Sequence, residues 1–254
     1  MIFCRFILKG QSIDEWKYGI VRNHQVQSLS PNPFSTYEIG EEEIPFNEIK
    51  LCSPVLPTKI VAVGVNYKEH AKEMGHLPPE NPLLFLKPPS SVIGPEEIIC
   101  YPKASSRVDY EAELAVVIKK KTKNILPEAA KDVILGYTCF NDVTARDLQK
   151  KDGQWTRAKG FDTFSAIGPW IVTDLEPSEL VVESYLNGEL KQSGKTNDMI
   201  FDVPHIVSFI SNIMTLEPGD IISTGTPVGI GPMQPGDMID IRIEGIGILR
   251  NFVE

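Results

Sequence analysis

Near its middle the chain reads DYEAELAVVI over residues 109–118. Successive residues of a β-strand face opposite sides, so Glu111 and Glu113 share one side and apolar residues continue it. The other side of the same strand is apolar throughout, which predicts one buried strand over residues 110–118. Two neighbouring carboxylates on a buried strand repel each other and require protons or a cation. The stretch therefore predicts a β-sheet core with a charged site attached to it.

Short strand-like runs dominate the chain on both sides of this stretch. The predicted strands cover 2–8, 16–21, 25–29, 59–65, 134–140, 181–186 and 189–192, and the predicted helices cover 67–74, 127–133, 143–151 and 203–213. Asn66 is predicted to cap the helix over 67–74, with Glu69 in the capping position. Asn187-Gly188 is typical of a type I′ hairpin turn. Because the helices do not alternate regularly with the strands, we predict a β-dominated α+β fold.

The first 53 residues differ in character from the rest, because short strands there are separated by prolines. Pro54 and Pro57 mark a junction, after which the apolar pattern becomes stronger. The sequence therefore predicts a small β-rich N-terminal domain over residues 1–53 and a main domain over residues 58–254.

Composition restricts the classes of partner and compartment. The 254 residues carry a net charge of −9, which argues against nucleic acid as the main partner because phosphates require clustered cations. No apolar run reaches the ~18 residues of a membrane span, and the apolar start is interrupted by Arg5 and is too short for a secretory signal. We expect a cytoplasmic protein that does not bind membranes, with its four cysteines as reduced core thiols.

A divalent metal is one remedy for the repulsion between Glu111 and Glu113. All-oxygen ligation suits Mg²⁺ or Mn²⁺, with Ca²⁺ as an alternative. Asp142 follows the predicted strand over 134–140 and is the candidate third ligand, because strand ends present side chains to sites. The alternatives remain that the glutamates lie at a wet strand start without a function and that Asp142 only caps a helix.

Three further features could contribute chemistry. His70 and Glu73 lie three residues apart, on one face of the predicted helix, where the carboxylate would make the imidazole a better base. Lys159 lies in an aromatic-flanked, glycine-containing turn that could meet an anion. The loop TGTPVGIGP over residues 224–232 could bring backbone N–H groups close to an anion. An exposed ion pair, a surface lysine and a plain turn are the simpler interpretations of these features.

Several of these motifs occur together and in a specific order. The series is Asn66-Tyr67-x-x-His70-x-x-Glu73, Leu84-Phe85-Leu86-Lys87-Pro88, Asp109-Tyr110-Glu111-x-Glu113-Leu114, Asn141-Asp142-Val143-Thr144-Ala145-Arg146-Asp147, Lys159-Gly160-Phe161-Asp162 and Thr224-Gly225-Thr226-Pro227-x-Gly229. From about residue 59 to the end, the chain thereby resembles the fumarylacetoacetate hydrolase superfamily. The resemblance implies a roll of mixed β-sheets that usually forms a homodimer.

The resemblance also implies roles for individual residues. Glu111, Glu113 and Asp142 match the metal carboxylates, and Lys159 matches the lysine that contacts substrate oxygens. The members of the remaining set match residues of a lid or of the substrate pocket. These are the dyad His70 and Glu73 on a lid helix, Arg146 and Gln149 lining the pocket, Thr226 at the substrate carboxylate, and Lys87 among the substrate-binding residues.

The function implied is a Mg²⁺- or Mn²⁺-dependent hydrolase of acylpyruvate-like or fumarylacetoacetate-like 2-oxo acids, which cleaves a C–C bond through a metal-bound enolate. Isomerisation of 2-hydroxyhepta-2,4-diene-1,7-dioate and decarboxylation, for example of oxaloacetate, stay open as alternatives. A metal-stabilised ligand-binding scaffold is the alternative without catalysis.

Overall fold

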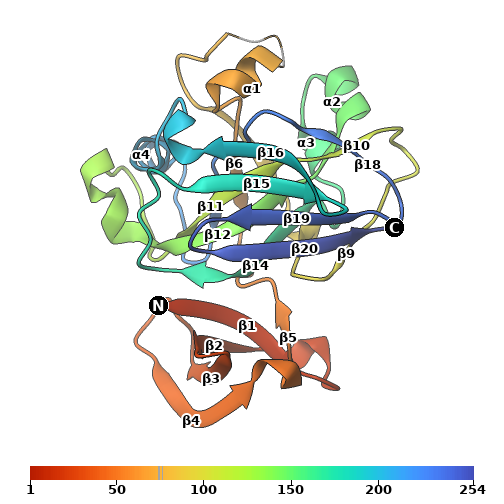
Figure 1. Cartoon of the computed structure of the whole chain (residues 1–254). Helices are drawn as coiled ribbons and strands as arrows, with labels where there is room; N and C mark the ends of the chain where they lie inside the picture. The colour runs from red at the N-terminus through yellow and green to blue at the C-terminus, as the bar shows by residue number, and fades with distance from the viewer. Residues whose placement is uncertain (74, 76) are drawn as a thin grey trace.

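The computed structural model describes residues 1–73, 75 and 77–254. Strands dominate these residues and form mixed sheets, so the predicted β-dominated fold class is confirmed. The N-terminal strands lie at one end of the molecule, and the helices α1 (Lys68–Glu73) and α2 (Arg146–Asp152) lie at the opposite end (Figure 1). Among the helices described, none is long and apolar enough to cross a membrane.

The strands of the described residues form three sheets. The largest sheet has 12 strands: β1 (Ile2–Leu8), β2 (Lys17–Arg22), β3 (Gln25–Ser30), β4 (Glu38–Pro45), β5 (Ile49–Cys52), β6 (Ile60–Gly64), β7 (Leu83–Lys87), β8 (Val92–Ile93), β11 (Ala112–Ile118), β12 (Ile134–Asp142), β14 (Ser165–Val172) and β17 (Ile221–Ser223). The second contains β9 (Ile98–Ile99), β15 (Val181–Leu186), β16 (Glu189–Lys195), β19 (Met238–Ile243) and β20 (Gly247–Val253). The third contains β10 (Val108–Tyr110), β13 (Thr144–Ala145) and β18 (Gly231–Met233).

Helices are short and lie at the ends of strands. The α-helices are α1 (Lys68–Glu73), α2 (Arg146–Asp152), α3 (Thr156–Lys159) and α4 (Val203–Ile213). The 3₁₀ helices are η1 (Ile13–Glu15), η2 (Phe46–Glu48), η3 (Pro89–Ser91), η4 (Pro127–Val133) and η5 (Thr196–Asp198). The predicted bounds of α4 and η4 are confirmed, and the Asn187-Gly188 turn joins β15 to β16 with positive φ at both residues, as a type I′ turn requires.

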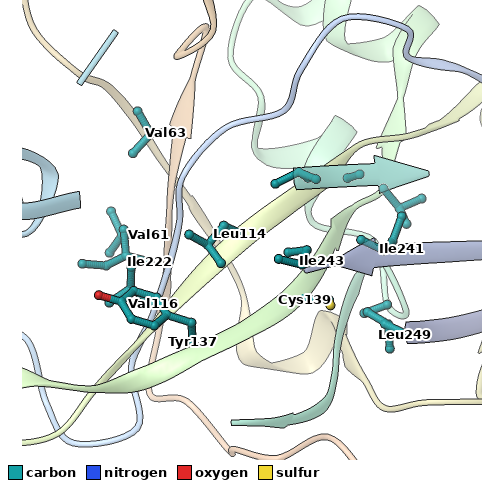
Figure 2. Close-up of a cluster of buried hydrophobic side chains, with 14 of the residues drawn as sticks. Val61, Val63, Leu114, Val116, Tyr137, Cys139, Ile222, Ile241, Ile243 and Leu249 are labelled. Atoms are coloured by element: carbon teal, nitrogen blue, oxygen red, sulfur yellow. The ribbon is translucent and has the colours of Figure 1, made fainter. Parts of the chain in front are cut away.

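The core is built around β11, every residue of which is buried. β11 pairs with β12 on one side and with β17 on the other. Figure 2 shows Val116 of β11 beside Ile222 and Tyr137, and Leu114 between Ile222 and Ile243 of β19. Full burial of such a side chain contributes roughly 1.5–3 kcal/mol, so β11 is a rigid base for the polar groups at its start.

The N-terminal strands continue the large sheet, because β1 pairs with β14. Phe3 and Ile20 also share a hydrophobic cluster with Val117 and Ile167 of the main part of the chain. The proposed division between residues 1–53 and 58–254 therefore stays a prediction. Three cysteines are free and buried as expected, but Cys100 is exposed.

Three local predictions were wrong. The strand over 110–118 is interrupted at Glu111, because the Glu111 N–H bonds to the side chain of Asn141 at 3.0 Å. The helix over 143–151 begins at Arg146, because β13 pairs with β10 first. The side chain of Asn66 does not serve α1 but bonds to the backbone of Phe201 and Thr224. The predicted helix end at Met74 lies outside the described residues.

Candidate metal and substrate site

Three buried carboxylates converge where β11 and β12 meet. Glu111 lies at the break between β10 and β11, Glu113 lies on β11, and Asp142 ends β12. The antiparallel pairing of Ala112 with Asn141 brings these positions together, and the Asp142 N–H bonds to the Glu111 carbonyl at 3.0 Å. One carboxylate oxygen of each residue lies within 4.8 Å of the others. The convergence predicted from the sequence is thus present, although Glu111 is not itself in a strand.

Three buried cations surround these carboxylates. Lys159 Nζ lies 2.8 Å from Glu111 Oε2 and 2.6 Å from Asp142 Oδ2. Lys87 forms an ion pair with Asp142 and bonds to the Phe164 carbonyl at 2.7 Å. Lys159 is therefore not the surface residue of the simpler interpretation, since it belongs to α3 and is almost fully buried.

Arg146 is the third cation, and its guanidinium is shared among several partners. It bonds to Asp109 Oδ2 at 2.8 Å and to Gln149 Oε1 at 2.6 Å, and it forms an ion pair with Glu111. Arg107 also forms an ion pair with Asp109. Among the three converging carboxyl groups, only Glu113 forms no ion pair with a described residue.

The environment of Glu113 makes its charge costly. Burial, together with the negative charges of Asp142 and Glu111, raises the pKa of Glu113 to about 8. Its Oε2 accepts hydrogen bonds from the Ser223 hydroxyl and from the Gly225 N–H at 2.8 Å. An ionised Glu113 would therefore be stabilised by further positive charge. A divalent cation would supply that charge, and the all-oxygen donor set of the three carboxylates suits Mg²⁺ or Mn²⁺.

Opposite charges counteract burial at the neighbours of Glu113. Burial opposes ionisation of Glu111, but Lys159 and Arg146 outweigh it and hold the pKa of Glu111 well below its usual value. Burial likewise opposes the charge of Lys159, but Asp142 and Glu111 raise the pKa of that ammonium. Burial lowers the pKa of Lys87, although Asp142 opposes that shift. The Lys87 nitrogen faces three oxygen acceptors, an arrangement that requires an ammonium group.

The predicted dyad lies on α1, next to the carboxylates. A small cavity of about 30 Å³ lies at the three carboxylates, and the buried side chain of His70 lines it as well. His70 Nδ1 lies 2.8 Å from Glu73 Oε2, and Glu73 Oε1 accepts a hydrogen bond from the Gly229 N–H at 3.1 Å. An ionised carboxylate only accepts, so Nδ1 carries the hydrogen and Nε2 is left able to accept a proton. The burial of His70 argues against an ordinary exposed ion pair.

Part of the cavity lining is apolar. Gly64, Val65, Phe85 and Trp155 form this apolar wall. Val65 has φ 56°, a strained conformation for a β-branched residue and one that occurs mainly at functional sites. A Cβ at Gly64 would lie 2.6 Å from the Trp155 ring, so a glycine is needed to seat that ring. This wall was missed in the sequence, where only the aromatic residues flanking Lys159 gave a signal.

All ten predicted site residues come together in this region. Most line the cavity directly, namely His70, Glu111, Glu113, Asp142, Arg146, Gln149, Lys159 and Thr226. Lys87 contacts Asp142, and Glu73 contacts His70. Their individual roles stay predictions. Sequence reasoning missed Asp109, Ser223 and Gln192, whose partners lie far away along the chain.

Removal of the buried Lys159 ammonium tests this charge balance. We expect Lys159→Met to lower the free energy of unfolding by about 3–5 kcal/mol in metal-free buffer, because two buried carboxylates lose their partner. Urea unfolding in the presence of EDTA measures the effect. Lys121→Met is the control, since its pair with Glu217 is exposed and surface pairs contribute about 0–1 kcal/mol. Equal stability of the two variants would contradict the balance.

Residues 59–254 match the model of the fumarylacetoacetate (FAA) hydrolase C-terminal domain. The chain belongs to the fumarylacetoacetate hydrolase family. The resemblance inferred from the six motifs is therefore confirmed, and the sheets described above have the fold of this family.

Two relatives within the fumarylacetoacetate hydrolase family have names that refer to oxaloacetate. The oxaloacetate tautomerase YisK of Bacillus subtilis is 44% identical over 264 residues, which cover 98% of this chain and 83% of the relative. The mitochondrial oxaloacetate decarboxylase of Dictyostelium discoideum is 48% identical over 206 residues, which cover 76% of this chain and 92% of the relative.

Solved structures of the family extend the range of named activities. The 2-hydroxyhepta-2,4-diene-1,7-dioate isomerase from Mycobacterium marinum is 43% identical, with a TM-score of 0.91 over 100% of this chain and 98% of that one. The maleylpyruvate hydrolase from Sphingobium sp. SYK-6, in complex with a manganese(II) ion and pyruvate, is 29% identical, with a TM-score of 0.81 and the same coverage. The family is enzymatic, and its members include isomerases, decarboxylases and hydrolases.

Proposed function

We propose that this chain is an enzyme that binds Mg²⁺ or Mn²⁺ at Glu111, Glu113 and Asp142 and acts on a small 2-oxo acid through its enolate. The observation that carries the proposal is the convergence of these buried carboxylates on one cavity, where Glu113 forms no ion pair with a described residue. The related hydrolase that holds manganese(II) and pyruvate supports both the metal and the substrate class.

The metal and the chain would have separate tasks. When bound, the divalent cation supplies Lewis acidity that polarises the 2-oxo group and favours the enolate. Lys159 lines the cavity and would hold the substrate oxygens with its ammonium group. Thr226 belongs to the glycine-rich loop, residues 224–232, and also lines the cavity, where it would orient the substrate carboxylate. Closure of α1 over the substrate would exclude bulk water.

Hydrolysis of an acylpyruvate is the first candidate reaction, and the His70–Glu73 pair favours it. His70 Nε2 would take a proton from a water molecule held under α1. The resulting hydroxide attacks the distal carbonyl carbon, the bond between that carbon and C3 breaks, and its electron pair remains on the pyruvate part as an enolate. Glu73 would stabilise the protonated imidazole through the 2.8 Å contact to Nδ1.

Chemistry on oxaloacetate or on a conjugated dienoate is the second candidate. The names of the relatives at 44% and 48% identity and of the isomerase at 43% identity favour it. In this case His70 would carry a proton to or from C3 without an attacking water, which gives tautomerisation or isomerisation. Loss of a β-carboxylate as CO₂ would leave the same enolate.

A turnover screen tests the proposal. The protein is incubated with Mn²⁺ and, separately, with EDTA, and offered acetylpyruvate, oxaloacetate and a conjugated 2-hydroxy-dienoate. We expect Mn²⁺-dependent turnover of at least one of them. Turnover of acetylpyruvate selects hydrolysis, and turnover of oxaloacetate or the dienoate selects the second candidate. Stabilisation by Mn²⁺ without turnover of any of these substrates would favour the non-catalytic scaffold.

A homodimer is proposed as the assembly, and light scattering in solution measures its mass.

A further inference from the structure

Gln192 reaches the site from a different sheet. It lies on β16 of the five-stranded sheet, and its side chain is fully buried. Its Oε1 accepts a hydrogen bond from the Ala112 N–H at 3.0 Å. Its Nε2 donates to Thr226 Oγ1 and to the Pro227 carbonyl, both at 2.8 Å. One amide therefore connects the backbone between Glu111 and Glu113 with the glycine-rich loop.

The glycine-rich loop packs directly on β16. A Cβ at Gly194 would lie 2.5 Å from the Cβ of Pro227, and a Cβ at Gly229 would collide with the Lys191 carbonyl. Gly229 also has φ 102°, a conformation that favours glycine. The loop and the strand are therefore in close contact on both sides of Gln192, so the loop has no room to move toward the strand.

The same loop supports two groups of the site. The Gly225 N–H bonds to the carboxylate of Glu113 at 2.8 Å, and the Gly229 N–H bonds to that of Glu73 at 3.1 Å. A displacement of the loop would thus move the donors to a candidate metal ligand and to the lid dyad together. Both consequences depend on how the loop is fixed to its surroundings.

An amide is the side chain that this position requires. The Thr226 hydroxyl donates its hydrogen to the Ala112 carbonyl at 2.9 Å, so toward Gln192 it can only accept. Gln192 meets one donor and two acceptors, which its carbonyl oxygen and NH₂ group satisfy together. A carboxylate has no hydrogens for Thr226 and Pro227, and an apolar side chain leaves all three partners unpaired.

We propose that Gln192 is a positioning residue that sets the glycine-rich loop against the carboxylate strand, and so sets metal affinity and the lid dyad at once. The inference rests on the proposed function. Gln192 comes from β16, and its side-chain hydrogen bonds go to Ala112, Thr226 and Pro227 rather than to the three carboxylates or His70.

The test compares Gln192→Met and Gln192→Glu with Ser193→Ala, whose side chain is exposed on the same strand. Calorimetry measures Mn²⁺ affinity and the affinity of the Mn²⁺-loaded protein for oxalate. Hydrogen exchange follows the amides of Gly225 and Gly229. We expect Gln192→Met to weaken both affinities about 10- to 100-fold and to speed exchange of both amides, with Ser193→Ala near wild type. A purely structural role would lower the melting temperature and leave both affinities unchanged.

A double-mutant cycle with Thr226→Val sharpens the result. In that background Gln192 has lost one partner, so we expect a smaller further loss of Mn²⁺ affinity from Gln192→Met than in the wild type. Additive losses, or affinities within about twofold of wild type in a folded Gln192 variant, would overturn the inference. If Gln192→Met does not fold, Gln192→Glu carries the comparison. If the wild type binds neither Mn²⁺ nor oxalate, the proposed function fails, and the exchange rates alone decide whether Gln192 fixes the loop.

Discussion

Glu113→Gln is expected to weaken Mn²⁺ binding by at least about 100-fold, the upper end of the losses seen when even an outer-sphere partner is removed. The stability of the metal-free protein should change little. Burial raises the pKa of Glu113 to about 8, so the metal-free carboxyl is mostly protonated at pH 7, and glutamine has the same shape and charge. Its carbonyl oxygen can still accept from Ser223 and Gly225.

Thermal melting across a Mn²⁺ titration measures this effect. A ligand at 100 times its Kd stabilises a protein by about 2.7 kcal/mol, and the wild type should gain this amount whereas Glu113→Gln should not. Oxalate binding should disappear along with the metal. Glu189→Gln is the control, because that carboxylate is largely exposed on β16. Wild-type stabilisation of Glu113→Gln by Mn²⁺ would exclude Glu113 as a ligand.

His70→Ala is expected to lower turnover of the substrate found in the screen by about 10²–10⁴-fold, the usual contribution of a general acid or base. Mn²⁺ affinity should stay at the wild-type value, because the proposed metal ligands are Glu111, Glu113 and Asp142 and do not include His70. The change in stability should be within about 1 kcal/mol, since α1 loses one hydrogen bond between side chains.

Steady-state kinetics with saturating Mn²⁺ give the result, and His205→Ala serves as the matched control, because His205 is exposed on α4. Glu73→Gln should show a smaller loss, since it keeps the imidazole in place but removes the negative charge beside it. Wild-type turnover of His70→Ala would remove the dyad from the mechanism while leaving the metal site untouched.

The sequence contained enough information for the core and for the carboxylates. The apolar runs of β11 and β12 predicted buried strands, and both strands are buried. Alternation placed Glu111 and Glu113 on one face of a single strand. The two carboxylates do converge, but through a break in that strand which depends on the side chain of Asn141. Strand periodicity cannot reveal a hydrogen bond from a distant segment.

Local sequence patterns could not predict the ion pairs of the site either, because the paired residues lie far apart along the chain. Lys87, Arg146 and Lys159 come from β7, α2 and α3, and only the folded chain places them against Asp142 and Glu111. Before folding, each of them looks like an ordinary surface cation. Gln192 gave no signal at all, because nothing in its surrounding sequence points to the glycine-rich loop.

The ion pairs of Lys87, Arg146 and Lys159 have a consequence for how the protein matures. If the proposed metal binds, a newly made chain would be able to fold before the metal arrives, since its own side chains pair with Glu111 and Asp142. Metal binding would then exchange these ion-pair partners, and the displaced ammonium and guanidinium groups would become available to an incoming anion. Metal capture and substrate capture would in this way be linked through the same few basic side chains.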